Sequence, residues 1–248
     1  MMRIVGVVQA RLGSTRLPRK ALADIHGKPM VIRVLDRVAR ARCLQDNLVP
    51  VIAAIPFGAE NKDLFDTIAE HGYPTYSGPE TDLIARLVDC ARAVDTDAIV
   101  RITGDCPLID WNAIDLCAEK FLVYGYHYFS NVCPRSYPDG LDVEVYSTEL
   151  LEYLFYKTRK LREWREDFPT YLWRHEDNPK ITRGNITRHP NIEEYRWTVD
   201  TREDLDWVRW VYDEMALDPR RRFFDMIDVL ALLDEYPNKV RTQDDYVH

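Results

Sequence analysis

The chain has 248 residues and a formal net charge of −8, and 46% of its residues are hydrophobic. This length and composition are enough for one large hydrophobic core, so we expect a single domain spanning residues 1–248. The acidic balance, and the lack of a basic stripe interleaved with aromatic residues, argue against a nucleic-acid partner.

Cysteine usage and the first apolar run bear on the compartment. The five cysteines are widely spaced and include no Cys-x-x-Cys pair, which argues against a disulfide framework or a zinc site. A reducing, cytoplasmic compartment is therefore expected. The run Ile4–Val8 is too short for a signal peptide or a membrane span, so no membrane partner is expected.

Strand and helix patterns alternate through the first half of the chain. Strands are predicted over 3–9, 49–55, around 75–76 and over 98–102. Amphipathic helices are predicted over 29–42, 61–71, 81–94 and 111–124. Four such repeats favour a three-layer α/β fold, Rossmann-like in its layering, with a mostly parallel sheet and helices on both faces.

After Tyr126 the pattern changes. Strands are predicted over 127–131, 141–146, 181–187 and 195–199. Helices are predicted within 148–176, over 201–215 and over 225–233, before a frayed tail from Pro237. The extra strands suggest a small inserted β-containing subdomain at about 127–190. Its many aromatic residues are typical of a core or a dimer interface.

The stretch from Gln9 to Lys20, QARLGSTRLPRK, follows the first buried strand and precedes the first helix. In open α/β sheets, ligands bind at this carboxyl end of a strand. Gly13 and Ser14 let backbone N–H groups approach an anion. Positive charges come from Arg11, Arg16 and Lys20. The loop predicts a ligand with several phosphates, although it matches neither a Walker A loop nor a dinucleotide fingerprint. The alternative is a solvated basic turn.

A second candidate site residue is Asp105, which follows the strand predicted over 98–102. At the same sheet edge as the basic loop, its carboxylate is placed to hold Mg²⁺ against a triphosphate. The alternative is that Asp105 caps the next helix or pins the turn. Cys106 is interpreted as structural, because no histidine lies near it in sequence to activate the thiol.

A third candidate, Asp200, ends the strand predicted over 195–199. Thr201 and Asp204 form a capping-box pattern for the next helix, and that cap does not need Asp200. Weaker signals lie between the second and third candidates. The loop over residues 77–82 is placed to recognise a base, or Thr81 or Glu80 simply caps the next helix. Asp142 and Glu144 share a strand face, where they could bind hydroxyls or an amine, or remain solvated.

The motifs around residues 9–20 and 27–30 resemble the amino-terminal signature of the CMP-sugar synthetases, and the Kdo cytidylyltransferases in particular. Over residues 3–215 the chain is more similar to the spore coat polysaccharide biosynthesis protein F group. Segments 101–107 and 199–205 resemble the family's Arg-x-x-Gly-Asp-x-Pro and Val-Asp-Thr-x-x-Asp-Leu motifs. The resemblance implies a nucleotide-diphospho-sugar transferase fold, a homodimer, and CTP with a small anionic acceptor as ligands.

The resemblance also implies residue roles. Asp105 and Asp200 would bind one Mg²⁺, and with Arg16 and Lys20 they would form the catalytic set. Nucleotide-binding residues would be Gln9, Ala10, Arg11, Gly13, Ser14, Arg16, Lys20, Thr81, Asp82, Arg86, Thr103 and Gly104. Acceptor-binding residues would be Asn131, Asp142, Glu144, Arg165 and Glu166. Asp167 departs from the related Arg-Glu-His-Val-Thr pattern, in which a His stands at its place.

The leading hypothesis is a CTP-dependent cytidylyltransferase, in which an acceptor oxygen attacks the α-phosphorus in line and pyrophosphate leaves. A 2-keto-3-deoxy sugar acid, a nonulosonic acid, a sugar phosphate and a phosphonate are all compatible acceptors. One alternative is a GT-A type glycosyltransferase of surface polysaccharide synthesis, for which only Asp142-Val143-Glu144 loosely offers an Asp-x-Asp-like site. The other is a non-catalytic nucleotide-binding protein.

Overall fold

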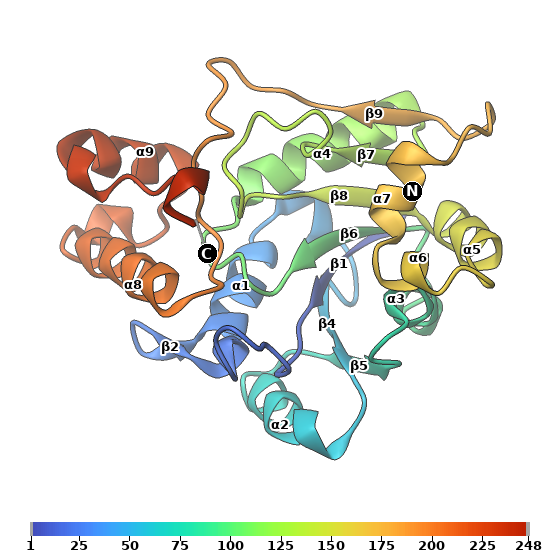
Figure 1. The fold of residues 1–248 in the computed structure, drawn as a ribbon, viewed down its shortest axis with the longest axis horizontal. Helices are drawn as coiled ribbons and strands as arrows, with labels where there is room; N and C mark the ends of the chain where they lie inside the picture. The colour runs from blue at the N-terminus through green and yellow to red at the C-terminus, as the bar shows by residue number, and fades with distance from the viewer. Residues whose placement is uncertain (1, 247–248) are drawn as a thin grey trace.

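The computed structural model describes residues 2–246, and a seven-stranded sheet lies at its centre (Figure 1). The strands lie in the order β5 (Thr75–Gly78), β4 (Val51–Pro56), β1 (Ile4–Gln9), β6 (Ala98–Thr103), β8 (Glu144–Ser147), β7 (Tyr128–Ser130) and β9 (Arg183–Asn185). β8 runs antiparallel to β6 and β7, and the other neighbours in this sheet are parallel. The predicted mostly parallel α/β sheet is confirmed.

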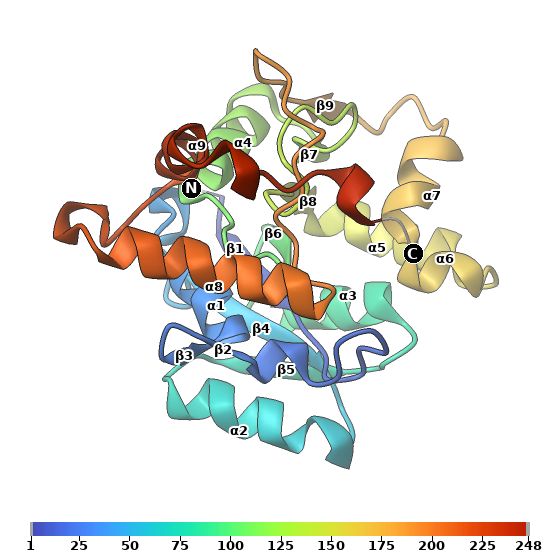
Figure 2. The same ribbon diagram turned by 60° about the vertical axis from the view of Figure 1, so that its left-hand side comes forward.

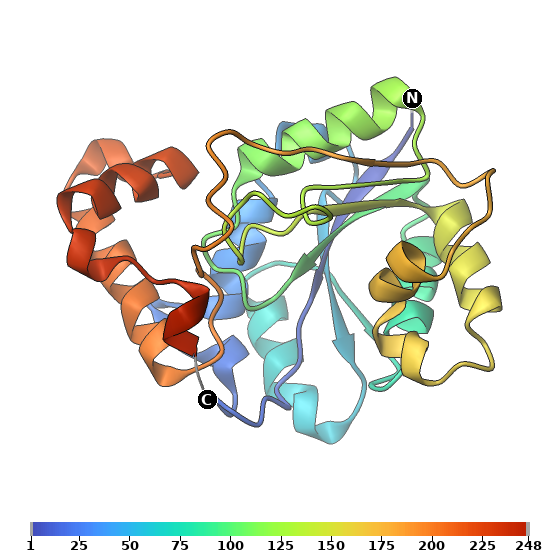
Figure 3. The same cartoon turned by 45° about the horizontal axis from the view of Figure 1, so that its top comes forward.

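Helices cover both faces of the sheet (Figures 1 and 3). One face packs against α1 (Met30–Val38), α2 (Lys62–Glu70) and α4 (Trp111–Tyr124). The other packs against α3 (Leu83–Ala93), α5 (Thr148–Lys157), α6 (Glu163–Glu166) and α7 (Phe168–Arg174). β1 serves both layers, because Ile4 and Val8 face one core cluster while Val5 and Val7 face the other.

A third core cluster lies to one side of the sheet (Figure 2). It is built on α8 (Arg202–Ala216) and α9 (Met226–Glu235), which pack around the fully buried Trp197. A short hairpin of β2 (Asp24–Ile25) and β3 (Lys28–Pro29) joins this cluster. Among the helices of residues 2–246, none combines the length and apolar character that a membrane crossing requires.

Helix α4 coincides with its predicted range because both of its ends carry strong signals. The Asp110 carboxylate accepts a hydrogen bond from the backbone N–H of Asn112, 2.8 Å away, at the start of the helix. Gly125 ends the helix in the left-handed region, at φ 63°. The predicted helical region over 148–176 is divided into three helices, α5 to α7.

The expected inserted subdomain does not form a separate sheet. β7, β8 and β9 extend the central sheet, and Phe129 and Val145 belong to the same core cluster as β1. Residues 127–190 are therefore part of the main body of the protein. Their expected roles in acceptor binding and in a homodimer remain predictions.

The strand expected over 141–146 begins only at Glu144, because the Asn131 side chain takes the place of strand pairing before it. The Asn131 amide donates to the carbonyl of Leu141, 2.7 Å away, and accepts from the N–H of Val143, 2.9 Å away. Asn131 is fully buried. Its side chain is committed to the backbone, so the expected role of Asn131 in acceptor binding does not fit this arrangement.

Two expectations near the carboxyl end are wrong. Residues 195–199 form isolated bridges, Tyr195 with Thr242 and Arg196 with Asp139, instead of a strand. The chain after Pro237 is not frayed along its described part, to residue 246, because it folds back onto α8. There the indole of Trp207 donates to the carbonyl of Lys239, 2.6 Å away.

We predict that Asn131→Ala lowers the free energy of unfolding by about 2 to 4 kcal/mol, because it leaves two buried backbone groups without partners. Equilibrium urea unfolding measures this change. Asn238→Ala, at an exposed position, is the matched control and should change the free energy by less than about 0.5 kcal/mol. A loss below about 1 kcal/mol for N131A would contradict the structural role of the amide.

Candidate active site

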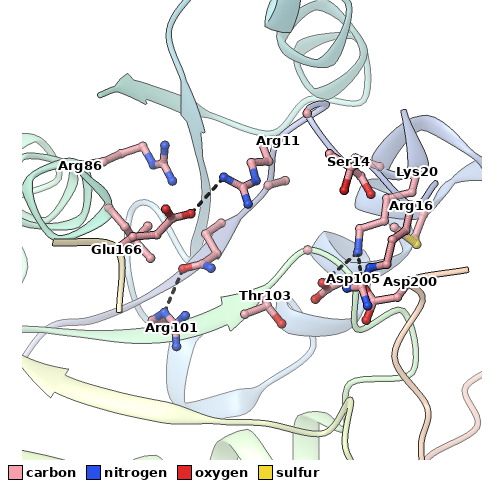
Figure 4. Close-up of a pocket in the computed structure, with 18 residues that line it drawn as sticks. Arg11, Ser14, Arg16, Lys20, Arg86, Arg101, Thr103, Asp105, Glu166 and Asp200 are labelled. Carbon is pink, nitrogen blue, oxygen red and sulfur yellow. Dashed lines mark hydrogen bonds and ion pairs between the residues drawn. The ribbon is translucent and has the colours of Figure 1, made fainter. Parts of the chain in front are cut away.

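A cavity of about 370 Å³ opens at the carboxyl ends of β1 and β6 (Figure 4). Its lining comes from the loop after β1, from α3, from the turn after β6, and from segments near Glu166 and Asp200. The lining residues are Gln9, Ala10, Arg11, Gly13, Ser14, Thr15, Arg16, Lys20, Ala21, Met30, Leu83, Arg86, Arg101, Thr103, Gly104, Asp105, Glu166 and Asp200. The two predicted motifs at this sheet edge therefore meet in one cavity.

Gly104 allows the two motifs to lie against each other. Its N–H donates to the carbonyl of Gln9, 2.8 Å away. A Cβ at position 104 would lie 2.8 Å from that carbonyl oxygen and 2.9 Å from the Cβ of Ala10. Only glycine fits this close approach without moving the backbone.

Internal hydrogen bonds shape the basic loop. The Ser14 hydroxyl accepts from the N–H of Leu17 at 3.3 Å, and the Ser14 N–H donates to the carbonyl of Leu12 at 2.8 Å. The side chain of Asn61 anchors the loop by accepting from the N–H of Leu12 at 3.2 Å. The loop is therefore ordered before any ligand binds, which reduces the entropy cost of binding.

The ammonium group of Lys20 lies at the centre of the site. It donates to Asp105 Oδ2 at 3.0 Å, to Asp200 Oδ1 at 2.9 Å and to the carbonyl of Val199 at 2.7 Å. Burial lowers the pKa of Lys20, but the nearby charges of the two aspartates outweigh it and leave the pKa raised. The candidate metal ligands are thus held together by a resident cation.

Asp200 is also held from its other side. Its Oδ2 accepts from Arg196 at 2.9 Å, and its Oδ1 lies 2.9 Å from Arg16. Burial raises the pKa of Asp200, but the hydrogen bond and charge of Lys20, with the two arginines, leave it lowered. Asp200 is therefore ionised and oriented.

Arg196 is a buried residue that sequence reasoning missed. It is 4% exposed and pairs with Asp139 and Asp204 as well as Asp200. The predicted capping box of Thr201 and Asp204 is confirmed, and Asp204 also accepts from the N–H of Asp200 at 2.9 Å. The sequence gave no clear signal for Arg196, because it lies four residues before Asp200 in a segment that is not helical.

The opposite wall of the cavity carries further positive charge. Burial, together with the nearby charge of Arg11, lowers the pKa of Arg86 to about 10. Arg11 itself pairs with Glu166 at 3.0 Å. Across the whole lining, five basic side chains face three carboxylates, a net charge of +2 in a protein of net charge −8. Such a cavity attracts a polyanion.

Two predicted nucleotide-binding residues, Thr81 and Asp82, do not line this cavity, and neither does Arg165, which was expected to bind the acceptor. Asp82 caps α3 by accepting from the N–H of Ala85 at 3.0 Å, so the helix is capped by neither Thr81 nor Glu80. The other Asp82 oxygen accepts from Arg165 at 2.6 and 2.9 Å. This partly buried pair joins the start of α3 to α6 and sets the position of Glu166, the next residue along α6.

A second cavity, of about 210 Å³, adjoins the first through Arg101 and Thr103, which line both. Its other lining residues are Val132, Asp142, Glu144, Asp167, Pro169, Thr170 and Trp173. Glu144 accepts from Arg101 and from the hydroxyls of Tyr128 and Tyr146. Asp142 forms a two-bond ion pair with Arg135. Of the five predicted acceptor residues, Asn131 and Arg165 line neither cavity.

Several lining residues were not predicted. Thr15, Ala21, Met30, Leu83 and Arg101 contact the first cavity without having been assigned to it. Arg101 stood inside the motif of residues 101–107, so its position was a usable signal. Cys106 is fully buried, and burial raises the pKa of its thiol well above the usual value. A high pKa is consistent with the structural role expected for this thiol.

Comparison with known proteins places this geometry in a family. The cytidylyltransferase family model matches residues 5–209. The spore coat polysaccharide biosynthesis protein SpsF of Bacillus subtilis is 27% identical over 92% of this chain and 93% of its own. A 3-deoxy-manno-octulosonate cytidylyltransferase of Trichlorobacter lovleyi is 38% identical, over 49% of this chain and 46% of its own.

Solved structures are also similar to this chain. A cytidylyltransferase from Leptospira borgpetersenii superposes with a TM-score of 0.86 at 26% identity, covering 98% of both chains. A CMP:2-keto-3-deoxy-manno-octonic acid synthetase, solved with CTP, shares the fold with a TM-score of 0.62 at 19% identity, over 86% of this chain and 99% of its own. A Mycobacterium tuberculosis protein in complex with manganese shares the fold at 14% identity, with a TM-score of 0.55 over 84% of this chain and 98% of its own.

The family match covers most of the chain, including the loop after β1, the turn after β6 and the segment around Asp200. These are the three segments that meet at Lys20. The chain belongs to the cytidylyltransferase family, whose members are CTP-dependent nucleotidyltransferases.

Proposed function

We propose that this enzyme transfers CMP from CTP to an oxygen of a small acceptor, with release of pyrophosphate. The observation that carries the proposal is the first cavity, in which a basic loop faces two aspartates held at one cation. The CTP complex of the synthetase that shares this fold supports CTP as the donor. The reaction forms a phosphorus–oxygen bond to the acceptor and breaks the bond to the leaving pyrophosphate.

The basic loop would bind the triphosphate. Arg11 and Arg16 can each grip phosphate oxygens with parallel N–H groups, and Lys20 adds a mobile point charge. All three line the cavity beside Gly13 and Ser14. As the bond to pyrophosphate breaks, negative charge grows on the leaving group, and these cations stabilise it. No covalent intermediate on the enzyme is needed.

Asp105 and Asp200 would hold a divalent cation. The resident ammonium supports this fit, because two carboxylate oxygens and the Val199 carbonyl converge on it within 3.0 Å. Within residues 2–246, no group of three or more His, Cys, Asp and Glu side chains is placed to hold a metal, so phosphate and water would complete the oxygen shell that Mg²⁺ prefers. When bound, the cation supplies Lewis-acid stabilisation of the reacting phosphate. The manganese complex noted above supports divalent-metal use in this fold.

The second cavity would hold the acceptor. An acid group would face Arg101, the basic residue that both cavities share, and hydroxyl groups would face Asp142, Asp167 and Thr170. This wall does not suit a metal-dependent glycosyltransferase, because Asp142 and Glu144 pair with two different arginines, Arg135 and Arg101, and do not converge on one cation. The proposed acceptor is a small molecule with an acid group and hydroxyls.

We predict that calorimetric titration with CTP, UTP, ATP and GTP, each with Mg²⁺, shows selective binding of CTP that weakens in EDTA. We expect this because the basic side chains of the cavity attract any triphosphate, while Leu83 and Arg86, near the start of α3, would contact the base. Tighter binding of another triphosphate would contradict the cytidine assignment. Binding of a nucleotide diphosphate sugar, with no triphosphate bound, would instead favour glycosyl transfer.

We predict that Asp105→Asn and Asp200→Asn each lower turnover roughly a thousandfold or more, because each removes one negative metal ligand. Pyrophosphate release from CTP measures turnover, and thermal unfolding checks that the fold is kept. Asp213→Asn, at an exposed carboxylate that pairs with His26, is the matched control and should keep full activity. Unchanged turnover in either site variant would remove the metal assignment.

We predict that Thr170→Trp fills the second cavity and so impairs acceptor binding without impairing CTP binding. Affinity for CTP should stay within about twofold, while turnover with each acceptor that the wild-type enzyme uses should fall at least roughly tenfold. Glu70→Trp, at an exposed position of α2, controls for the added indole. Equal losses of CTP binding and acceptor turnover would show that the acceptor does not enter there.

A further inference from the structure

We propose that Lys20 is an exchangeable internal cation: it occupies the divalent-metal position until the metal arrives and then moves to the triphosphate. The inference rests on the proposed metal role of Asp105 and Asp200. It adds that the lysine and the metal compete for the same oxygens, so the ammonium blocks the metal position until the metal binds.

The ammonium group is fully engaged as it stands. A lysine ammonium has three N–H donors, and here they are directed at Asp105, Val199 and Asp200, at 3.0, 2.7 and 2.9 Å. In this arrangement Lys20 has no donor left for a phosphate oxygen. Conversely, Asp105 Oδ2 and Asp200 Oδ1 cannot bind a divalent ion without losing the ammonium. The two roles assigned to Lys20 and to the aspartates therefore exclude each other in the observed arrangement.

Electrostatics makes the exchange necessary. A divalent ion bound to the same carboxylate oxygens would stand against the ammonium, and two cations at such a distance in a partly buried site repel strongly. The Lys20 side chain is 13% exposed, so water screens little of that repulsion. Binding of the metal must therefore displace the ammonium from between the aspartates.

The frame around the two aspartates remains when Lys20 leaves. Arg196 keeps its hydrogen bond to Asp200 Oδ2, which points away from the ammonium. The N–H of Val199 donates to the main-chain carbonyl of Asp105 at 2.9 Å, so the two ligand segments stay joined. The displaced side chain belongs to the same loop as Gly13 and Ser14 and reaches the cavity that they line. There an incoming triphosphate offers the ammonium new anionic partners.

The exchange couples metal and nucleotide. Metal alone must displace Lys20 into a cavity whose remaining carboxylate, Glu166, is already paired with Arg11. Nucleotide alone meets a lysine that is already paired. When both are present, the metal releases the Lys20 ammonium for the triphosphate, and the triphosphate draws the ammonium away from the oxygens that the metal binds. Positive cooperativity between metal and triphosphate follows, and it depends on the charge of residue 20.

The test measures Mn²⁺ binding to the full-length protein without nucleotide, by electron paramagnetic resonance. Lys20→Met removes the charge and keeps the chain length, and we expect it to bind Mn²⁺ at least tenfold more tightly than the wild type. Lys20→Arg keeps a cation and should bind as weakly as the wild type. Lys28→Met removes an ion-paired lysine outside the cavity and should also match the wild type. Equal or weaker Mn²⁺ affinity in K20M would overturn the proposal.

A further substitution distinguishes failure of the exchange from failure of the proposed metal site. Asp105→Asn added to K20M should abolish the tight Mn²⁺ binding. If K20M and the wild type bind equally and the added D105N abolishes binding in both, the exchange is wrong and the metal site stands. If D105N leaves Mn²⁺ binding unchanged, the metal site itself is wrong, and the exchange is wrong with it.

A second readout is taken on the wild-type protein, and the K20M variant serves only to assign one resonance. The Lys20 ammonium resonance, observed by proton–nitrogen NMR and assigned by its loss in K20M, reports its hydrogen-bond partners. Addition of Mg²⁺ with the unreactive analogue α,β-methylene-CTP should shift it, as the partners change from carboxylates to phosphates. A resonance that keeps its position at saturation would overturn the exchange.

Discussion

The ammonium of Lys20 ties together the loop after β1, the turn after β6 and the segment that enters α8. Asp105 and Asp200 are 85 and 180 residues from Lys20 in the chain, and no local preference would bring them to one point. Two carboxylates gathered at a sheet edge repel each other unless a cation lies between them. Before any ligand binds, that one positive charge therefore offsets the repulsion between the two aspartates.

The charges around this point form two groups with different exposure. Arg196 and Asp204 are almost fully buried and lie behind the aspartates, where they fix orientation. Arg11 and Arg16 are about half exposed and lie in front, toward solvent. A buried ion pair is costly to break, while an exposed pair is easily rearranged. The inner group is thus suited to hold the site, and the outer group to exchange its partners for phosphates.

Sequence patterns predicted the structure correctly where several local signals agreed. α4 has apolar spacing, a capping aspartate and a terminal glycine, and its bounds were correct. The basic loop and Asp105 lie in motifs that follow buried strands, so the sheet topology alone brings them to one edge. The parallel direction of β4, β1 and β6 followed from the alternation of strands and helices.

The failures have a common physical cause, which is that alternation of buried residues does not reveal hydrogen-bond partners. Trp197 and Val199 are fully buried, as the pattern over 195–199 required, yet the backbone pairing in this segment consists of single bridges at Tyr195 and Arg196. At Asn131, a side-chain amide makes hydrogen bonds to the backbone where strand pairing was expected. Arg196 was missed because one of its partners, Asp139, is 57 residues away.

The shared wall of Arg101 and Thr103 also bears on how enzymes of this kind diversify. On the proposal above, the donor side is built from the loop after β1 and the aspartates, while the acceptor side is built largely from α7 and residue 167. Because the two sides meet at only two lining residues, mutations in α7 can accumulate without disturbing the chemistry. Natural selection could then fit the same transfer reaction to new acceptors by changing one short helix.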